Sequence, residues 1–199
     1  MYWEFFSFEQ NPISYMKRST VYTLSIIIVI LSFFVTPLGD FSKELLNKLF
    51  ATTPTVISVE NRGKIATYDW KLKRADWSFF NFKEAQNEVT FINFWATWNL
   101  PSRAQLDDIQ KLYDRYGAKM KFYIITNEER EFPEEMMERK GYTFPVTYQI
   151  IGEPSPLKLL KEGGSYLLDK KGHIVIHQTA ISDWDNGVVY DLIEKLLSE

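Results

Sequence analysis

The run from Ser19 to Gly39 contains no charged residue, and this feature constrains the fold of the chain more than any other. At about 1.5 Å per residue, a helix of this length reaches ~31 Å, which matches the hydrocarbon core of a bilayer. No polar residue recurs at helical spacing through Ile26–Leu31, so a core helix with one water-facing side is not expected. The sequence therefore predicts a transmembrane helix over residues 19–39.

The charges on the two sides of this run predict its orientation. Lys17 and Arg18 directly precede it, whereas the first charge after it is Asp40. Because basic residues favour the cytoplasmic side, we expect residues 1–18 in the cytoplasm and the remainder outside it. A cleaved signal peptide is the alternative, but the preceding segment is long and partly acidic, and no small-residue cleavage site follows. We therefore expect a single-pass protein of the cytoplasmic (inner) membrane with a periplasmic or otherwise extracytoplasmic C-terminal domain.

Composition excludes several classes of function for the rest of the chain. The net charge of −3 lacks the basic excess that binding to a phosphate backbone needs, so no nucleic acid partner is expected. The absence of cysteine removes disulfides, thiolate nucleophiles, iron–sulfur clusters and cysteine-ligated zinc. We expect neither a metal nor a cofactor. The 45% of hydrophobic residues is nevertheless enough to bury a core.

Residues 40–54 are expected to connect the membrane helix to a folded domain over residues 55–199, with a short helix over residues 40–51. In that domain, β-branched and aromatic runs alternate with amphipathic ones. The patterns predict extended segments at 56–60 and 65–72, loop and edge structure at 76–88, a central strand at 89–95, a helix at 101–117, a strand at 122–126, a helix at 132–140, a strand at 146–151, a helix at 155–162, a hairpin of 165–168 with 173–177, and a helix after Trp184. This order predicts an α/β fold of three layers, with helices flanking a central mixed sheet.

The junction between the predicted central strand and the following helix carries the most specific pattern. FINFWATW, followed by Pro101, Arg103 and Ala104, resembles the thioredoxin superfamily and, within it, the membrane-tethered TlpA-like thiol-disulfide oxidoreductases. The motif of that family runs WATWC-x-P-C-R-A-E. The likeness continues through YLLDKKGHIVI and the segment at Trp184, and covers roughly residues 56–198. The resemblance implies a thioredoxin-like fold.

Both cysteines of that motif are replaced in this chain. The first position falls on Asn99 and the second on Ser102, while Trp98 and Pro101 are kept. Thiol–disulfide exchange proceeds through a thiolate, which an amide or an unactivated hydroxyl cannot replace. Asn99 is a favourable N-cap and Pro101 suits a first helical turn, so the substitutions should keep the helix and remove the chemistry. We expect no catalytic residue at this junction, although enzymatic activity of another kind stays open.

The resemblance also implies a cis-proline loop that faces the motif. Anchoring on LLDKKGHIVI places that position at Gly163, with Pro145 as the other candidate. A cis bond without proline costs ~2.5 to 4 kcal/mol, so we expect a trans bond and a more mobile loop.

Ser102 acting as a nucleophile of another kind would need a base within hydrogen-bond reach. The two histidines, His173 and His177, are predicted on one face of one strand, about 13 Å apart at the rise of a strand. We expect them to be surface residues, and neither a catalytic base nor a pair of metal ligands.

These observations predict a redox-inactive domain that binds a protein or an extended peptide. The candidate binding residues are Trp98, Asn99, Leu100, Pro101, Ser102, Gly163, Gly164 and Ser165. The alternative is a non-catalytic component of a thiol–disulfide pathway, in which another protein supplies the cysteines.

Overall fold

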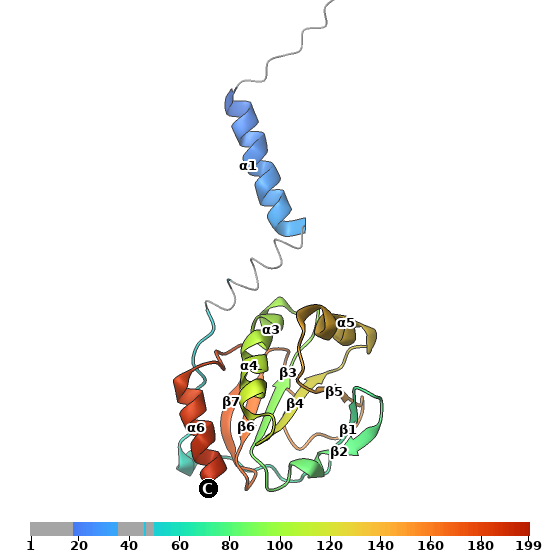
Figure 1. Cartoon of the computed structure of the whole chain (residues 1–199), viewed down its shortest axis with the longest axis vertical. Coiled ribbons are helices and arrows are strands. Elements are labelled where there is room, and N and C mark those ends of the chain that lie inside the picture. Colours follow the sequence, from blue (N-terminus) through green and yellow to red (C-terminus); the bar gives the residue numbers. More distant parts are fainter. Residues whose placement is uncertain (1–17, 36–45, 47–49) are drawn as a thin grey trace, which may run out of the picture. The chain divides into compact units, whose positions relative to one another are not determined.

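The structure is a computed structural model that describes residues 18–35, 46 and 50–199, and the chain divides into two units, residues 1–42 and 43–199. In the first unit, helix α1 spans Arg18–Val35 (Figure 1). Within the described residues, no helix has both the length and the apolar character needed to cross a membrane. Residues 36–39 of the predicted membrane helix and nearly all of the predicted connector helix lie outside the described residues.

A mixed sheet of seven strands forms the centre of the second unit, in the order β2-β1-β5-β4-β3-β6-β7 (Figure 1). Strand β4 runs parallel to both β3 and β5, and every other neighbouring pair in the sheet is antiparallel. The strands are β1 (Lys71–Arg74), β2 (Phe79–Asn81), β3 (Thr90–Phe94), β4 (Lys121–Thr126), β5 (Val146–Gln149), β6 (Ser165–Leu168) and β7 (Ile174–Gln178). The predicted mixed sheet, its central strand and the antiparallel hairpin β6–β7 are confirmed.

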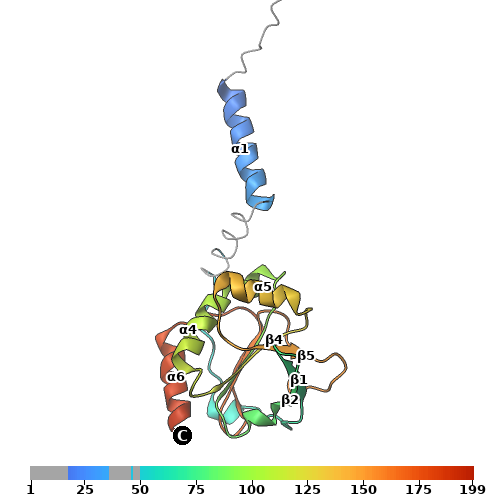
Figure 2. The ribbon, with the colours of Figure 1, turned by 45° about the vertical axis from the view of Figure 1, so that its right-hand side comes forward.

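Within the described part of this unit, four α-helices and two short 3-10 helices accompany the sheet. The α-helices are α3 (Leu100–Ala104), α4 (Leu106–Tyr116), α5 (Glu131–Lys140) and α6 (Gly187–Ser198), and the 3-10 helices are η1 (Val59–Asn61) and η2 (Phe82–Ala85). The predicted last helix is present and is capped by Asn186, whose side chain accepts a hydrogen bond from the Val189 amide at 3.1 Å. Helices α4 and α6 lie side by side in both ribbon views (Figures 1 and 2).

The alternation of side chains along the strands divides the core into two clusters. Helices α4, α5 and α6 contribute to one cluster, where the rings of Phe91 and Trp184 meet edge to face at 4.7 Å. The other cluster contains no residue of an α-helix. It is formed by strand residues together with residues 65–85 and the loop that contains Leu157 and Leu160. One face of the sheet is therefore covered by helices, and the other mainly by loop segments and η2.

Three sequence predictions about elements are wrong in detail. The helix predicted at 101–117 is interrupted at Gln105, which separates α3 from α4. Residues 155–162 form bends and irregular loop instead of a helix, and Leu157 packs into the second cluster. In the extended segment predicted at 56–60, Val56 makes an isolated bridge and residues 59–61 form η1, and the segment predicted at 65–72 becomes a regular strand only from Lys71.

Candidate functional site

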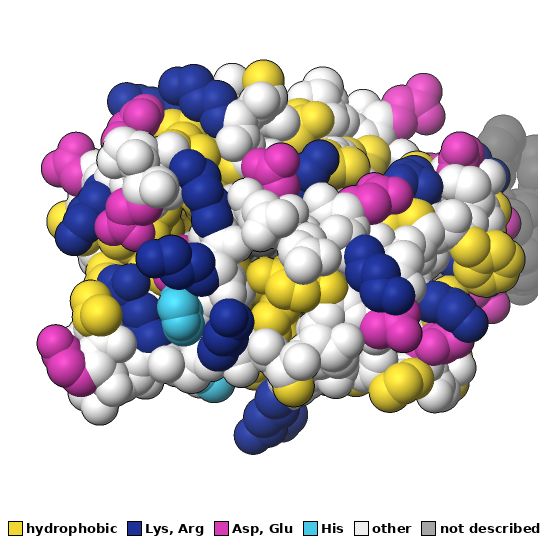
Figure 3. Space-filling model, turned by 90° about the horizontal axis from the view of Figure 1, so that it is seen from below, with side chains coloured by type: hydrophobic (Ala, Val, Ile, Leu, Met, Phe, Trp, Pro, Cys, Tyr) yellow, Lys and Arg dark blue, Asp and Glu magenta, His cyan; other side chains and the backbone are white. Residues whose placement is uncertain are grey.

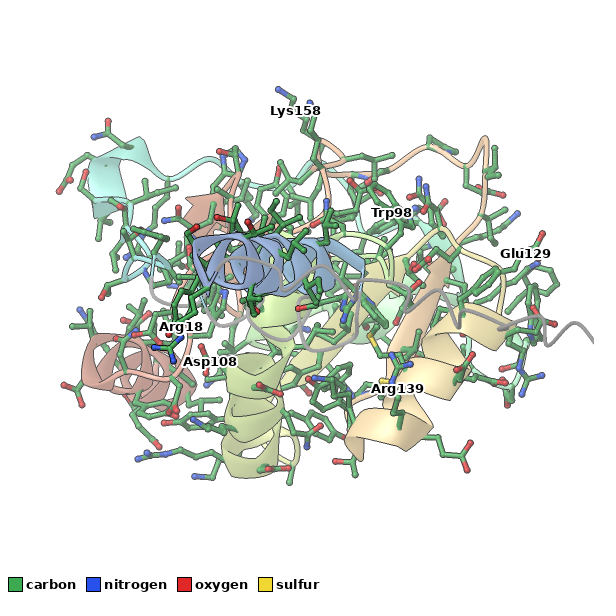
Figure 4. All side chains as sticks on the ribbon, turned by 90° about the horizontal axis from the view of Figure 1, so that it is seen from above. Arg18, Trp98, Asp108, Glu129, Arg139 and Lys158 are labelled. Carbon is green, nitrogen blue, oxygen red and sulfur yellow. The ribbon has the colours of Figure 1, made fainter. Side chains whose placement is uncertain are left out.

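The loop between β3 and α3 presents Trp98 at the surface, where 64% of the residue is exposed. The side chains of Glu128 and Arg103 form hydrogen bonds with the neighbouring residue Thr97. The Glu128 carboxylate accepts hydrogen bonds from the Thr97 amide at 2.7 Å and from the Thr97 hydroxyl at 2.6 Å, and Arg103 Nη1 donates to the Thr97 carbonyl at 3.3 Å. In the view from above, Trp98 lies between Lys158 and Glu129 (Figure 4). These contacts hold the backbone next to the exposed Trp98.

Asn99, at the first cysteine position of the motif, caps helix α3. Its side-chain oxygen accepts a hydrogen bond from the Ser102 amide at 2.8 Å, and its backbone is extended (φ −92°, ψ 98°), as an N-cap requires. Pro101 follows within the first turn, where a missing amide hydrogen costs nothing. The predicted cap is therefore confirmed.

Ser102, at the second cysteine position, is fully buried. Its hydroxyl oxygen lies 2.9 Å from the Asn99 carbonyl and 3.2 Å from the Ala96 carbonyl, and it accepts a hydrogen bond from the Ala96 amide at 3.2 Å. All of these partners are backbone groups, which cannot deprotonate a hydroxyl. The residue fastens the start of α3 to the end of β3 and offers no activated nucleophile.

Gly163 lies opposite the motif, as the predicted alignment requires. A Cβ atom on Gly163 would lie 3.9 Å from Ser102 Cα and 3.1 Å from Ile181 Cγ2, and its φ of +97° favours glycine. Pro145 instead lines a cavity beside Tyr123. The described residues contain no cis peptide bond, so the expected trans bond is present. The expected mobility of the loop stays a prediction.

The backbone of this loop is bonded within the domain. The Gly163 amide donates to the Phe94 carbonyl at 2.6 Å, and the Gly164 carbonyl accepts from the Phe94 amide at 2.9 Å. Ser165 is buried and receives a hydrogen bond from the Asn93 side chain at 2.9 Å. Gly163, Gly164 and Ser165 therefore belong to the interior, and they do not offer free backbone groups to a partner strand.

Gln105 is a site residue that the sequence patterns missed. It is buried at the break between α3 and α4, where its Nε2 donates to the Gly163 carbonyl at 3.2 Å and its Oε1 accepts from the Ser182 amide at 3.3 Å. The family motif ends in glutamate at this position, and the amide of glutamine supplies both a donor and an acceptor. The only sequence signal for this residue was that the chain has glutamine where the family motif has glutamate.

The predicted binding residues separate into two groups. Trp98 and Pro101 are exposed, and Asn99 and Leu100 are half-buried. The other four, Ser102 and Gly163 to Ser165, are buried. The structure brings all eight to one end of the sheet, but only the first group reaches the surface.

The two histidines lie apart from this site and have different surroundings. His173 Nδ1 lies 2.9 Å from an Asp169 carboxylate oxygen in the turn of the β6–β7 hairpin. His177 stacks on Tyr166 with ring centroids 4.7 Å apart, and burial lowers the pKa of its imidazole, with a smaller contribution from Lys158. Neither contacts Ser102, whose hydrogen bonds are all to backbone groups.

Replacing Asn99 by alanine tests the capping role of this position. The Asn99→Ala variant should lower the free energy of unfolding by about 1 kcal/mol, because the Ser102 amide loses its acceptor. Asn99→Asp keeps an acceptor oxygen and should stay near the wild type. Urea unfolding of the three proteins measures the difference, and equal stabilities for the alanine and aspartate variants would contradict the assignment.

Sequence comparison finds relatives among bacterial thioredoxin-like proteins. The chain is 26% identical over 110 residues to "Thioredoxin-like protein YneN" of Bacillus subtilis, which covers 53% of this chain and 65% of that protein. It is 25% identical over 171 residues to "Thiol-disulfide oxidoreductase ResA" of Bacillus cereus, which covers 80% of this chain and 88% of that protein. The chain thus spans a little less than two thirds of YneN.

Solved structures share the fold at low sequence identity. A secreted thiol-disulfide isomerase from Corynebacterium glutamicum superposes with a TM-score of 0.59 at 17% identity, over 75% of this chain and 95% of that one. A DsbF homologue from Corynebacterium diphtheriae gives a TM-score of 0.56 at 14% identity over the same shares. The thioredoxin-like α/β fold is therefore confirmed. The profile of the AhpC/TSA family matches residues 62–177, more than half of the sequence, and the chain therefore belongs to the AhpC/TSA family.

Proposed function

We propose that this chain is a redox-inactive thioredoxin-like protein that binds a protein partner through the surface of Trp98, Leu100 and Pro101. The proposal rests on the structural roles of Asn99 and Ser102, which occupy the two cysteine positions of the family motif. Asn99 caps α3 and Ser102 joins that helix to β3, so both positions have become structural. The fold of a thiol–disulfide oxidoreductase is kept without a group that can carry out the exchange.

The lack of redox activity follows from the chemistry of exchange. A mixed disulfide forms only when a thiolate attacks a sulfur atom, and the chain contains no cysteine. The Ser102 hydroxyl is buried, and its hydrogen-bond partners among the described residues are all backbone groups.

The Trp98 loop has properties that favour binding to a protein. Trp98 is a large exposed aromatic residue, of the kind that often dominates the energy of an interface. Because Glu128 and Arg103 already hold the adjacent Thr97, less of the loop backbone has to be ordered when a partner binds. The paired backbone of Gly163 and Gly164 argues against addition of a peptide strand at that loop. The contact we propose is therefore made by side chains.

A second candidate function is a non-catalytic role in a thiol–disulfide pathway. It is favoured by the relatives, since the protein that is 25% identical over 171 residues is a thiol-disulfide oxidoreductase. In that role the partner at the Trp98 surface would itself carry the reactive cysteines.

We also propose that residues 19–39 anchor the protein in the cytoplasmic membrane, with the thioredoxin-like domain outside the cytoplasm. The support is the absence of charge in this run and the basic pair Lys17 and Arg18 before it. A structurally similar protein from Corynebacterium glutamicum is described as secreted, which is consistent with this location.

Photo-crosslinking from the loop tests the binding surface. Benzoylphenylalanine placed at Trp98 in the full chain should yield a discrete crosslinked protein in intact cells, and a second substitution, Leu100→Asp, should abolish it. Val188 is a matched control, because it is similarly exposed, at 57%, but lies on α6. The same product from both positions, or none from Trp98, would argue against this surface.

Alkaline carbonate extraction tests the anchor. The full chain should stay in the membrane pellet, whereas Ile28→Lys together with Ile30→Lys should release it, since each charge at a helix centre costs about 2.5 to 3.5 kcal/mol on insertion. A protease-sensitive tag after Glu199 then reports which side the domain occupies. Release of the wild-type chain by carbonate would overturn the anchor without affecting the crosslinking result.

A further inference from the structure

A cavity of about 420 Å³ lies at the end of the sheet opposite the Trp98 loop. It is lined by the end of β1, the β1–β2 turn, Phe80, Glu84 and the beginnings of β4 and β5. Because β3 and β4 run parallel, the beginning of β4 lies at the other end of the sheet from the loop that follows β3. The volume falls in the range of about 300 to 1,000 Å³ typical of small-molecule sites.

The wall of the cavity is mainly apolar, and its rings are held in place by their neighbours. The rings of Phe80 and Tyr123 stack with centroids 5.9 Å apart and an angle of 10° between their planes. The fully buried Phe82 meets the Tyr123 ring with centroids 4.8 Å apart. Pro145 and Val146 add aliphatic surface. A ligand would therefore meet a preformed apolar surface.

The cavity opens to solvent at the β1–β2 turn. Tyr123 belongs to the core cluster that contains no residue of an α-helix, and the cavity is bordered by that turn instead of by a helix. Ala75 and Asp76, both in the turn, line the cavity and are exposed. A small molecule can therefore reach the cavity from solvent beside these two residues.

The charges that line the cavity cancel. Its basic residues are Arg74 and Lys121, and its acidic residues are Asp76 and Glu84. The Arg74 guanidinium lies 4.4 Å from the Phe80 ring centroid and donates to both Glu84 carboxylate oxygens, at 2.6 and 2.8 Å. Seen from below, acidic and basic side chains lie interspersed around smaller hydrophobic areas (Figure 3). The lining therefore offers a ligand no net charge.

The two charges outside the Arg74–Glu84 ion pair oppose each other. Asp76 accepts hydrogen bonds from the Ser78 hydroxyl at 2.6 Å and the Ser78 amide at 2.9 Å, and these bonds lower the pKa of its carboxyl group. Asp76 therefore stays negative at neutral pH, whereas the exposed Lys121 is positive. A charged ligand would be attracted by one of these groups and repelled by the other.

We propose that this cavity binds an uncharged aromatic molecule. The ring packs against Phe80, Tyr123 and Pro145 and removes their apolar surface from water. A charged molecule would give up hydration without a net attraction in return, because the charges of the lining cancel. The site is separate from the Trp98 surface, so it does not depend on the proposed function.

Calorimetric titration of the full chain with three indole compounds tests the site. Indole, indole-3-acetate and tryptamine share one ring system and carry no charge, a negative charge and a positive charge. We expect saturable binding of indole and at least about five-fold weaker binding of both charged compounds, because neither recovers its lost hydration. A blank titration in the same buffer and detergent removes partitioning into micelles.

Two charge variants test the cancellation. Asp76→Asn keeps an acceptor for Ser78 but leaves the lining with a net positive charge, so it should bind indole-3-acetate about two- to five-fold more tightly than the wild type does. Lys121→Gln leaves a net negative charge and should improve tryptamine binding to a similar degree. Neither variant should change the affinity for indole. Both residues are exposed, so both variants are expected to fold.

Two tryptophan variants locate the binding. Ala75→Trp should fill the cavity from the turn and weaken indole binding by at least about ten-fold. Val188→Trp is the matched control, because it introduces the same side chain at an exposed position of α6 and should leave the affinity unchanged. Trp98→Ala, at the other end of the sheet, should also leave it unchanged.

Three outcomes would overturn the proposal. They are no saturable binding of indole up to millimolar concentration, binding of either charged compound as tightly as indole, or an affinity for indole that Ala75→Trp leaves unchanged. The first two are measured on the wild-type chain, so they apply whether or not a variant folds.

Discussion

Burial of β3 on both faces is the constraint on which the rest of the domain depends. All five of its residues are buried, and it is hydrogen-bonded to β4 on one edge and to β6 on the other. A strand enclosed in this way needs apolar side chains in both directions, which Phe91 supplies toward the helices and Ile92 toward the second cluster. Its fixed end determines where the Trp98 loop begins and which residues meet Gly163.

Polar contacts at the end of β3 hold the site in a structural role. Gln105 connects the break between α3 and α4 to Gly163 and Ser182, and Glu128 holds Thr97. Asn99 and Ser102 use their side chains to start the helix. Because buried donors and acceptors are costly to leave unpaired, these contacts stabilise the shape of the site in the absence of cysteine chemistry.

The sequence predicted the fold where local patterns and long-range packing agree. The buried run of β3, the amphipathic spacing of α4 and the cap by Asn99 each follow from a few neighbouring residues. The site was only partly predictable, since the cap by Asn99 is local whereas the burial of Ser102 and Gly163 arises from distant segments. Gln105 and the cavity beside Tyr123 depend on contacts across the sheet, which no periodicity reveals.

A thiol–disulfide exchange assay tests the central claim most directly. Insulin reduction by dithiothreitol would be followed for the wild-type chain, for Asn99→Cys with Ser102→Cys, and for ResA of Bacillus cereus as a relative. The account predicts no acceleration by the wild type and a gain of exchange in the double variant, because the restored thiols would stand at the start of α3 on a backbone that is otherwise kept. Acceleration by the wild type would contradict the claim of redox inactivity. An inactive but folded double variant would show that the departures at Gly163 and Gln105 also remove the exchange.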